Sequence, residues 1–372
     1  MLLSEKVNSL LENSPYHLSK DDKKIKLIEL CKLQVDHHIH NCKEYKEWYQ
    51  RNKFKLPKEI SDINDIPFIP SSVFKFLNLT SSNNKSKKIS SSGTTSQLKS
   101  NIFIDSKTSL NQTSALSKIL SSHIGKSRIP FFIIDFEPTS DNLGSTEMSA
   151  RYAGMSGYLL AAKKRNYLLK HDENQNVVVC ENALKELKSI SMDTPIVIIG
   201  YTYMIWQFIN NHKNVNLDIQ LHKDSKIVHF GGWKKLSSQK VSKEELNQNI
   251  SEHFSIKKEN ILDIYGFTEQ LGTIYVSQGN QGCRVSDYSH VIVRDTETFE
   301  EVKDGKKGFL QFISCLPESY PGFSIINDDI GYISRRITDE FGKEVIEFKV
   351  EERLQQAEAR GCGDTLPEDY FI

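Results

Sequence analysis

The stretch PIVIIGYTYMIWQFI, residues 195–209, is the longest apolar run of the chain and decides the fold we expect. Residues 195–199 are continuously apolar, which is typical of a strand buried on both faces. The whole run is too short to span a bilayer, and Gly200 and Gln207 interrupt it. We therefore predict a buried strand that leads directly into a helix.

Similar apolar runs lie on both sides of this stretch. They are residues 130–135, 176–180, 226–230 and 260–264, and helical patterns lie nearby at 108–123, 150–160, 182–190, 204–212 and 243–254. This alternation of strand and helix predicts an α/β fold with a largely parallel sheet. Residues 101–104 also alternate like a strand, and residues 286–333 show the alternation and turn residues of β-hairpins.

The two ends of the chain follow other patterns. Residues 1–54 predict helices, one of which starts at Asp21-Asp22. Residues 66–70, IPFIP, predict an extended segment because two prolines restrict the backbone. Residues 345–372 predict a short segment that ends in an irregular tail.

Composition limits the classes of partner. The 372 residues carry 48 Lys+Arg and 48 Asp+Glu, so no net field favours nucleic acid or an anionic membrane. The start, MLLSEK, turns polar too early for a signal peptide. Six cysteines without paired short spacings indicate reduced thiols. We expect a cytoplasmic protein without a membrane span, whose partners are small molecules or proteins.

Histidines gather in one helical segment, HHIHNC at residues 37–42. His38 and Cys42 would share a helix face, which invites a metal-site interpretation. A closed zinc site needs four ligands, and no second His/Cys pair lies nearby in sequence. Packing of these side chains in the core is therefore the interpretation that we favour.

A run of hydroxyl residues around one glycine, SSSGTTSQLK, occupies residues 90–99. Gly93 can adopt positive φ, so the loop can turn sharply and present backbone N–H groups to an anion. The hydroxyls add hydrogen-bond donors and Lys99 adds a positive charge. The alternative is a flexible linker, since residues 80–100 are rich in Ser, Asn and Lys.

Three further motifs have residues that suit a nucleotide. The first, HFGGWK at residues 229–234, follows an apolar strand and lets a planar ring approach the backbone, unless it is only a tight turn. The second, YGFTE at 265–269, combines a ring that can stack, a hydroxyl and a carboxylate that can bind Mg²⁺. The third, NDDIG at 327–331, places a carboxylate before an expected glycine turn, where it suits ribose hydroxyls or an ordinary hairpin.

In this order the motifs resemble those of the adenylate-forming (AMP-binding) acyl ligase superfamily. The closest resemblance is to the acyl-protein synthetase family, known from the fatty-acid reductase system of bioluminescent bacteria. IPFIP at 66–70, the loop 91–96, GGWK at 231–234 and AEARGCG at 357–363 are similar to that family, and the resemblance covers essentially the whole chain. It implies an adenylate-forming large domain with mixed or parallel sheets at residues 1–335 and a shortened C-terminal segment at 336–372.

The resemblance also implies a reaction, its cofactors and its site residues. ATP and Mg²⁺ would convert a carboxylic acid, expected to be a fatty acid, to an acyl-adenylate, and a cysteine near the C-terminus would accept the acyl group and pass it to an acyl reductase or carrier. Thr268 would contact the α-phosphate and Glu269 would bind Mg²⁺. The other expected nucleotide contacts are Ser91, Ser92, Gly93, Thr94, Thr95 and Lys99 at the phosphates, Gly231, Gly232, Tyr265 and Gly266 around adenine, and Asp329 at the ribose.

Cys362 is the expected acyl acceptor. It lies between Gly361 and Gly363, so little bulk hinders attack, and Arg360 would favour the thiolate. The alternative is a bystander thiol in a loose tail. The other five cysteines, namely Cys31, Cys42, Cys180, Cys283 and Cys315, lie in patterned segments and are expected to be buried packing residues.

The chain departs from the superfamily pattern in three places. Ser96, Leu98 and Ser100 stand where the phosphate loop usually has glycine, proline and glycine, and Glu352-Arg353 stands at the Gly-Arg hinge. The full C-terminal domain with its catalytic lysine does not fit in the given length, and Lys234 is a candidate substitute or a surface lysine. The acid pocket is expected from residues 149–158, 201–206 and Trp233.

Two rival functions stay open. One is an acid–CoA ligase similar to phenylacetate–CoA ligase, which would use free coenzyme A instead of Cys362. The other is a non-catalytic nucleotide-binding subunit on the same fold, which the substitutions in the phosphate loop would suit.

Overall fold

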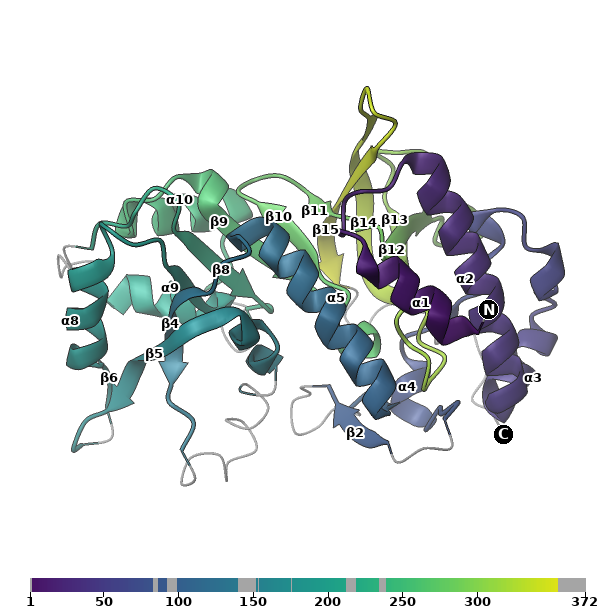
Figure 1. Cartoon of the computed structure of the whole chain (residues 1–372), viewed down its shortest axis with the longest axis horizontal. Coiled ribbons are helices and arrows are strands. Elements are labelled where there is room, and N and C mark those ends of the chain that lie inside the picture. The colour runs from purple at the N-terminus through teal and green to yellow at the C-terminus, as the bar shows by residue number, and fades with distance from the viewer. Residues whose placement is uncertain are drawn as a thin grey trace. The chain divides into compact units, whose positions relative to one another are not determined.

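A computed structural model describes residues 2–82, 86–91, 99–139, 152, 154–174, 176–211, 219–233 and 239–353. The chain divides into two compact units, and Figure 1 shows their helices and strands. Unit 1 comprises Met1–Lys118, Gly266–Ile274 and Arg284–Ile372, and unit 2 comprises Ile119–Tyr265 and Tyr275–Cys283. The division that we expect at residue 335 stays a prediction.

Unit 1 begins with the expected helices, α1 (Leu3–Glu12), α2 (Lys20–Asn41) and α3 (Lys43–Arg51), followed by the single turns η1 (Pro57–Glu59) and η2 (Ile63–Asp65). Helix α2 starts where the Ser19 hydroxyl accepts a hydrogen bond from the Asp22 N–H at 3.1 Å. Its buried face includes Leu27, Leu30 and Val35. His38 lies in this core with both ring nitrogens bonded, Nδ1 to Ser81 Oγ at 2.7 Å and Nε2 to Gln34 Oε1 at 2.8 Å.

The sheet of unit 1 is antiparallel, as the hairpin pattern predicts. Its neighbours in order are β12 (Ser289–Arg294), β13 (Gly308–Ser314), β14 (Ser324–Thr338) and β15 (Glu344–Arg353), and β1 (Ile69–Pro70) pairs with β14 in parallel. The extended segment IPFIP therefore ends in this sheet, and α4 (Val73–Phe76) follows it. Two more strands, β2 (Lys87–Ser90) and β3 (Asn101–Ile104), form a separate two-stranded sheet.

The glycine turn expected at residues 327–331 is wrong, because these residues lie inside strand β14. Gly331 is nevertheless required there. A Cβ at this position would lie 2.3 Å from the carbonyl oxygen of Lys349 on β15. Glycine therefore serves close strand packing rather than a turn.

Unit 2 contains the parallel sheet that the apolar runs predict. Its order is β10 (Tyr275–Gln278), β9 (Ile261–Tyr265), β8 (Lys226–Phe230), β7 (Val197–Tyr201), β4 (Ile129–Phe136), β5 (Ala162–His171) and β6 (Val177–Val179). Strands β9, β8, β7, β4 and β5 are parallel, whereas β10 and β6 are antiparallel to their neighbours. Strand β5 was not predicted, because its sequence AKKRNYLLKH carries charges in place of an apolar run.

Helices cover the strands of unit 2. They are α8 (Glu181–Ile190), α9 (Thr202–Asn211) and α10 (Lys243–His253), with the short turns η3 (Tyr158–Ala161) and η5 (Lys258–Asn260). The stretch 195–209 forms β7 and α9 in direct succession, as predicted, and α9 contacts β4, β7 and β8. Helix α5 (Ser106–Ile124) and strand β11 (Cys283–Arg284) lie where the chain passes from one unit to the other.

In the part of the chain that the structure describes, no helix combines the length and the apolarity needed to cross a membrane.

Candidate functional site

The carboxyl ends of the parallel strands in unit 2 hold one set of candidate residues. Strands β7, β8 and β9 run in register, so Tyr201, the Phe230–Gly231 junction and Tyr265 all lie at the edge where these strands end. Ligands of open α/β sheets bind outside this edge. The structure therefore brings the Gly231-Gly232 turn and Tyr265 to the same edge of unit 2.

Gly231 has a backbone conformation that requires glycine. Its φ is +73°, and a Cβ there would lie 3.1 Å from the Tyr201 ring. Gly232 differs, since its Cβ would meet no atom within 4 Å. Both glycines are exposed, so a flat ligand can reach the backbone of the turn.

Tyr265 ends strand β9 and is half-buried. It is the register partner of Tyr275 on β10, and the two ring centroids are 6.2 Å apart. One side of the Tyr265 ring is thus supported by a neighbouring ring, as a stacking platform requires. Gly266 is exposed, and a Cβ there would make only ordinary contacts, the nearest at 3.7 Å.

The expected acid pocket includes aromatic residues of unit 2. The Tyr201 and Phe230 rings are 4.6 Å apart, and the Trp206 and Trp233 rings are 5.5 Å apart. Residues 149–151 and 153 lie outside the described part of the chain. The location of the acid pocket therefore stays a prediction.

Thr268 and Glu269 belong to unit 1, where they form the single turn η6 (Thr268–Gln270). Thr268 is half-buried and Glu269 is 8% exposed. The Tyr320 hydroxyl donates to the Glu269 carbonyl at 3.0 Å. Gln270 donates from Nε2 to the carbonyls of Phe312 and Gly322 at 2.9 and 2.8 Å, so η6 is fixed to the core on both sides.

The hydroxyl loop begins and ends at the sheet β2–β3, which also belongs to unit 1. Ser91 N donates to Ser100 O at 2.9 Å, and Ser100 N donates to Ser91 Oγ at 3.0 Å, so the two ends are joined. Lys99 is exposed. Strand β3, which follows the loop, contacts η6, the turn that carries Thr268 and Glu269. Ser92, Gly93, Thr94 and Thr95 lie outside the described residues.

Asp329 lies on β14 of unit 1 and is 7% exposed. Asn327 holds it in place, because Asn327 Nδ2 donates to Asp329 Oδ2 at 3.0 Å and Asp329 N donates to Asn327 Oδ1 at 3.1 Å. The structure thus places Asp329 on a different element from η6 and from the loop base.

The donor chemistry of these residues fits a magnesium nucleotide. Mg²⁺ in nucleotide sites takes one or two carboxylates together with phosphate oxygens, and η6 offers the Glu269 carboxyl group and the Thr268 hydroxyl at adjacent positions. In unit 2, Gly231 and Gly232 have no side chain and are exposed, so a flat ring can approach their backbone. Both features suit the group that the sequence motifs indicate.

Several residues of the site were missed by sequence reasoning. His229 and Asp263 are polar residues inside otherwise apolar strands, and they face each other across β8 and β9 with Nδ1 and Oδ1 3.6 Å apart. Lys243 of α10 lies 3.1 Å from Asp263 Oδ2. A polar residue at the same register position of two apolar strands is a signal that could have found them.

Burial and charge shift the pKa values of this group. Burial lowers the pKa of His229 below its usual value, although the Asp263 carboxylate acts in the opposite direction. Burial alone would raise the pKa of Asp263, but His229 and Lys243 together hold it below its usual range. At neutral pH, His229 is therefore neutral and Asp263 is ionised.

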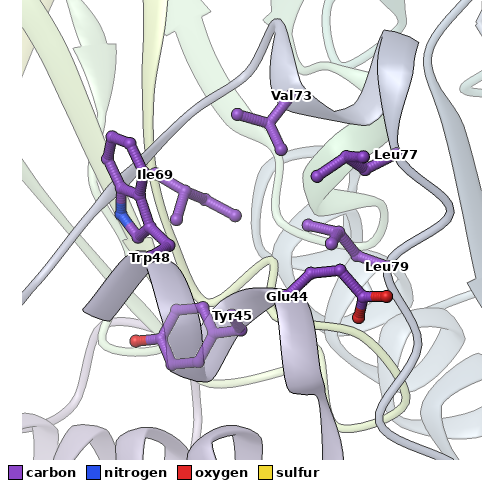
Figure 2. Close-up of a pocket in the computed structure, with 7 residues that line it drawn as sticks. All are labelled: Glu44, Tyr45, Trp48, Ile69, Val73, Leu77 and Leu79. Carbon is purple, nitrogen blue, oxygen red and sulfur yellow. The ribbon is translucent and has the colours of Figure 1, made fainter. Parts of the chain in front are cut away.

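A small apolar pocket in unit 1 is separate from these motifs. Figure 2 shows side chains from α3, β1, α4 and the segment that follows α4 around it, namely Glu44, Tyr45, Trp48, Ile69, Val73, Leu77 and Leu79. Its volume of about 10 Å³ is enough for about one water molecule. It is too small to hold an acyl chain.

The cysteines differ in exposure. Cys31, Cys42, Cys283 and Cys315 are buried, as expected, whereas Cys180 is only half-buried. Burial raises the pKa of Cys42 to about 11, so this thiol is not a ready nucleophile. Cys362 and Lys234 lie outside the described residues, so the acyl-acceptor assignment stays a prediction.

Comparison with known proteins gives consistent matches over the whole chain. A family model described as acyl-protein synthetase, LuxE, matches residues 2–371. A long-chain-fatty-acid–luciferin-component ligase from Vibrio harveyi is 23% identical over 362 residues, covering 96% of this chain and 91% of that protein. The protein of the same name from Aliivibrio fischeri is 24% identical over 328 residues, covering 84% of this chain and 83% of that protein.

Solved structures show the same fold. A 2-hydroxyisobutyryl-CoA ligase in the postadenylation state matches with a TM-score of 0.61 at 10% identity, covering 90% of this chain and 68% of that chain. An open conformation of that ligase matches with a TM-score of 0.60 at 11% identity, covering 91% of this chain and 76% of that chain. The expected α/β fold of adenylate-forming ligases is confirmed.

Proposed function

Since this chain belongs to the acyl-protein synthetase family LuxE, a family of ligases, we propose that it activates a fatty acid with ATP and transfers the acyl group to its own Cys362. The acyl group then passes to a partner protein, an acyl reductase or carrier. The observation that supports this most is the contact between η6 and β3. Because the hydroxyl loop leads into β3, this contact supports a common phosphate and metal site for the loop, Thr268 and Glu269.

The first step joins the acid to the nucleotide. A carboxylate oxygen of the acid attacks the α-phosphorus of ATP, the bond to the β-phosphate oxygen breaks, and pyrophosphate leaves. Ser91, Lys99 and the loop residues Ser92, Gly93, Thr94 and Thr95 hold the phosphates, and Thr268 donates to the α-phosphate. Glu269 would hold Mg²⁺, which would supply positive charge against the phosphate oxygens.

The remaining nucleotide contacts come from residues whose surroundings suit them. Asp329, held by Asn327, accepts hydrogen bonds from the ribose hydroxyls. Gly231 and Gly232 line adenine, because their exposed backbone admits a flat ring, and Tyr265 with Gly266 covers it. These assignments follow the motif positions and the geometry of each element.

The second step moves the acyl group to the chain itself. The Cys362 thiolate attacks the acyl carbonyl carbon, the bond to the phosphate oxygen breaks, and AMP leaves while the thiol proton passes to solvent. A thioester keeps the carbonyl reactive, so a reductase or carrier can accept the acyl group next.

Intact-protein mass spectrometry tests both steps. We expect incubation with ATP, Mg²⁺ and fatty acids of graded length to add one hydroxylamine-labile acyl mass to the wild type and none to Cys362→Ser. Cys180→Ser is the matched control and should be acylated like the wild type, because Cys180 is a half-buried thiol to which the proposal gives no role. An acyl mass on Cys362→Ser would contradict the acceptor assignment.

The other outcomes identify the rival functions. Acid-dependent pyrophosphate release without any adduct would mean that free coenzyme A or another protein accepts the acyl group. Stabilisation of the fold by ATP without pyrophosphate release would mean a non-catalytic nucleotide-binding subunit, since a ligand that binds the native state raises its stability.

A further inference from the structure

A row of polar residues crosses the apolar sheet of unit 2. Gly200 on β7, His229 on β8, Asp263 on β9 and Ser277 on β10 are consecutive register partners. Neighbours in register share a sheet face, so this row forms one band. Lys243 of α10 closes the band, because its ammonium contacts both Asp263 and Ser277.

The Thr202 hydroxyl joins this row to the Gly231-Gly232 turn. Thr202 is the first residue of α9, and its Oγ1 lies 2.9 Å from Gly231 O, 3.3 Å from Phe230 O and 3.0 Å from His229 Nδ1. Carbonyl oxygens only accept, so the single hydroxyl proton goes to a carbonyl, and Gly231 O is the nearer one. In the tautomer that lets Thr202 donate to Gly231 O, His229 Nδ1 carries a proton and donates it to Thr202.

The charges around His229 support this tautomer. Asp263 Oδ1 lies 3.6 Å from Nδ1 and attracts a proton on that nitrogen. His229 Nε2 is buried and has no hydrogen-bond partner among the described residues. A buried nitrogen without a partner is costly, so packing alone would favour an apolar side chain at this position. The hydrogen bond at Nδ1 therefore accounts for a histidine, rather than an apolar residue, at this position.

We propose that His229 is a positioning residue that holds the Gly231-Gly232 turn in its nucleotide-binding conformation through the Thr202 hydroxyl. This inference rests on the proposed function, which assigns adenine to that turn. Gly231 has positive φ and packs against Tyr201, so the direction of its carbonyl decides how the exposed backbone is presented. Thr202 fixes that carbonyl, and His229 fixes Thr202.

Removing either partner should weaken ATP binding without changing the chemical step. We expect His229→Leu and Thr202→Val to raise the KM for ATP in acid-dependent ATP–pyrophosphate exchange about fivefold to tenfold, as loss of one hydrogen bond implies. The kcat should stay within about twofold. The double variant should be no worse than Thr202→Val alone, because both changes break one chain of bonds.

Conservative variants should bind ATP nearly as well as the wild type. Thr202→Ser keeps the hydroxyl, and His229→Asn keeps an N–H donor near the position of Nδ1. Both should bind ATP within about threefold of the wild type. A merely structural role would not distinguish these donors from leucine and valine.

Hydrogen exchange of the free protein tests the positioning without any nucleotide. The peptide that carries Gly231, Gly232 and Trp233 should exchange about fivefold faster in His229→Leu and Thr202→Val than in the wild type. The matched control is His290→Leu. His290 is a buried histidine of β12 in unit 1, and it also has one ring nitrogen, Nδ1, without a hydrogen-bond partner among the described residues. The substitution should change neither this peptide nor the KM for ATP.

Three outcomes would overturn the inference. They are unchanged exchange of the turn in both variants, independent and multiplying effects of the two substitutions on KM, and an equal effect of His290→Leu. If the wild type neither binds ATP nor exchanges pyrophosphate, the proposed function fails, and the hydrogen-exchange arm still decides whether His229 positions the turn.

Discussion

Two glycines with nearly the same positive φ but different surroundings distinguish the cost of backbone strain from the cost of steric crowding. Gly272 has φ +85° and Gly305 has φ +84°. A Cβ at Gly272 would lie 2.5 Å from the Gln112 backbone on α5, whereas a Cβ at Gly305 would meet nothing within 4 Å. Gly272 therefore sets how closely the segment after η6 can approach α5.

This difference predicts unequal costs for the same substitution. Gly305→Ala should lower the free energy of unfolding by about 1–2 kcal/mol, the cost of the left-handed region for a residue with a Cβ. Gly272→Ala should add about 1–3 kcal/mol to that, because the helix backbone cannot move aside cheaply. Urea denaturation of the two variants measures both values. Equal losses would show that space at Gly272 does not matter.

The turn η6 is the element on which the catalytic assignment depends. Its side chain Gln270 is 1% exposed and donates to two carbonyls that lie far away in sequence, on Phe312 and Gly322. Glycine is required at 322, since a Cβ there would lie 2.8 Å from Glu269 O. The position of Thr268 and Glu269 is thus held by long-range backbone contacts.

Removing the Gln270 donor should therefore reduce catalysis. In Gln270→Leu, two buried carbonyls lose their partner, which costs about 1–3 kcal/mol for each group that stays unsatisfied. We expect η6 to shift and kcat for pyrophosphate exchange to fall at least about tenfold, because small displacements of positioned groups cost rate. Gln248→Leu on the exposed face of α10 is the control and should retain kcat. A Gln270→Leu enzyme with wild-type kcat would contradict this role.

At the scale of the whole molecule, three histidines that are buried among the described residues link stability to pH. Burial lowers the pKa values of His38, His229 and His290 below the usual value. His37 adds to this effect at His38, and Lys23, Arg336 and Lys24 add to it at His290, against Asp62. At His229, Lys243 lowers the pKa and Asp263 raises it. All three are neutral in the native protein at pH 7.

The sign of the pH dependence follows from these directions. The unfolded state binds more protons than the native state below a pH of about 6.5, the pKa of a free histidine. The free energy of unfolding should therefore fall as the pH drops from 7 to 5, with a slope of up to about 1.4 kcal/mol per pH unit for each histidine. Urea denaturation across this range measures it. His290→Leu should flatten the slope, whereas Gln248→Leu, which removes no titratable group, should not.

Local sequence patterns predicted the positions of most strands but not the contacts between strands that are distant in sequence. The runs 101–104 and 226–230 agree with β3 and β8 residue for residue, because continuous apolar runs and alternation are local signals. Strand β5 escaped prediction, since its burial comes from pairing with β4 and β6 rather than from its own composition. The turn expected before Gly331 failed because the neighbour that requires glycine, Lys349, belongs to another strand.

The candidate site shows the same division. Sequence motifs identified Gly231, Tyr265 and Thr268 as candidates at or shortly after the ends of strands β8 and β9, and their binding roles stay predictions. The contacts that support η6 could not be predicted, because the bond from Tyr320 to the Glu269 carbonyl joins residues 51 positions apart and that from Gln270 to Gly322 joins residues 52 apart. Only the fold pairs such residues.

The separate sheet β2–β3 means that stability is not uniform across the molecule. A lone two-stranded hairpin is only marginally stable. Strand β3 buries Ile102 and Ile104, but β2 exposes Lys87, Lys88 and Ser90, so β2 can detach while β3 stays in place. The free energy of this local opening is far below that of global unfolding. Under the proposed function, a phosphate ligand at the hydroxyl loop would spend part of its intrinsic binding energy on closing the hairpin, so its apparent affinity would include that equilibrium.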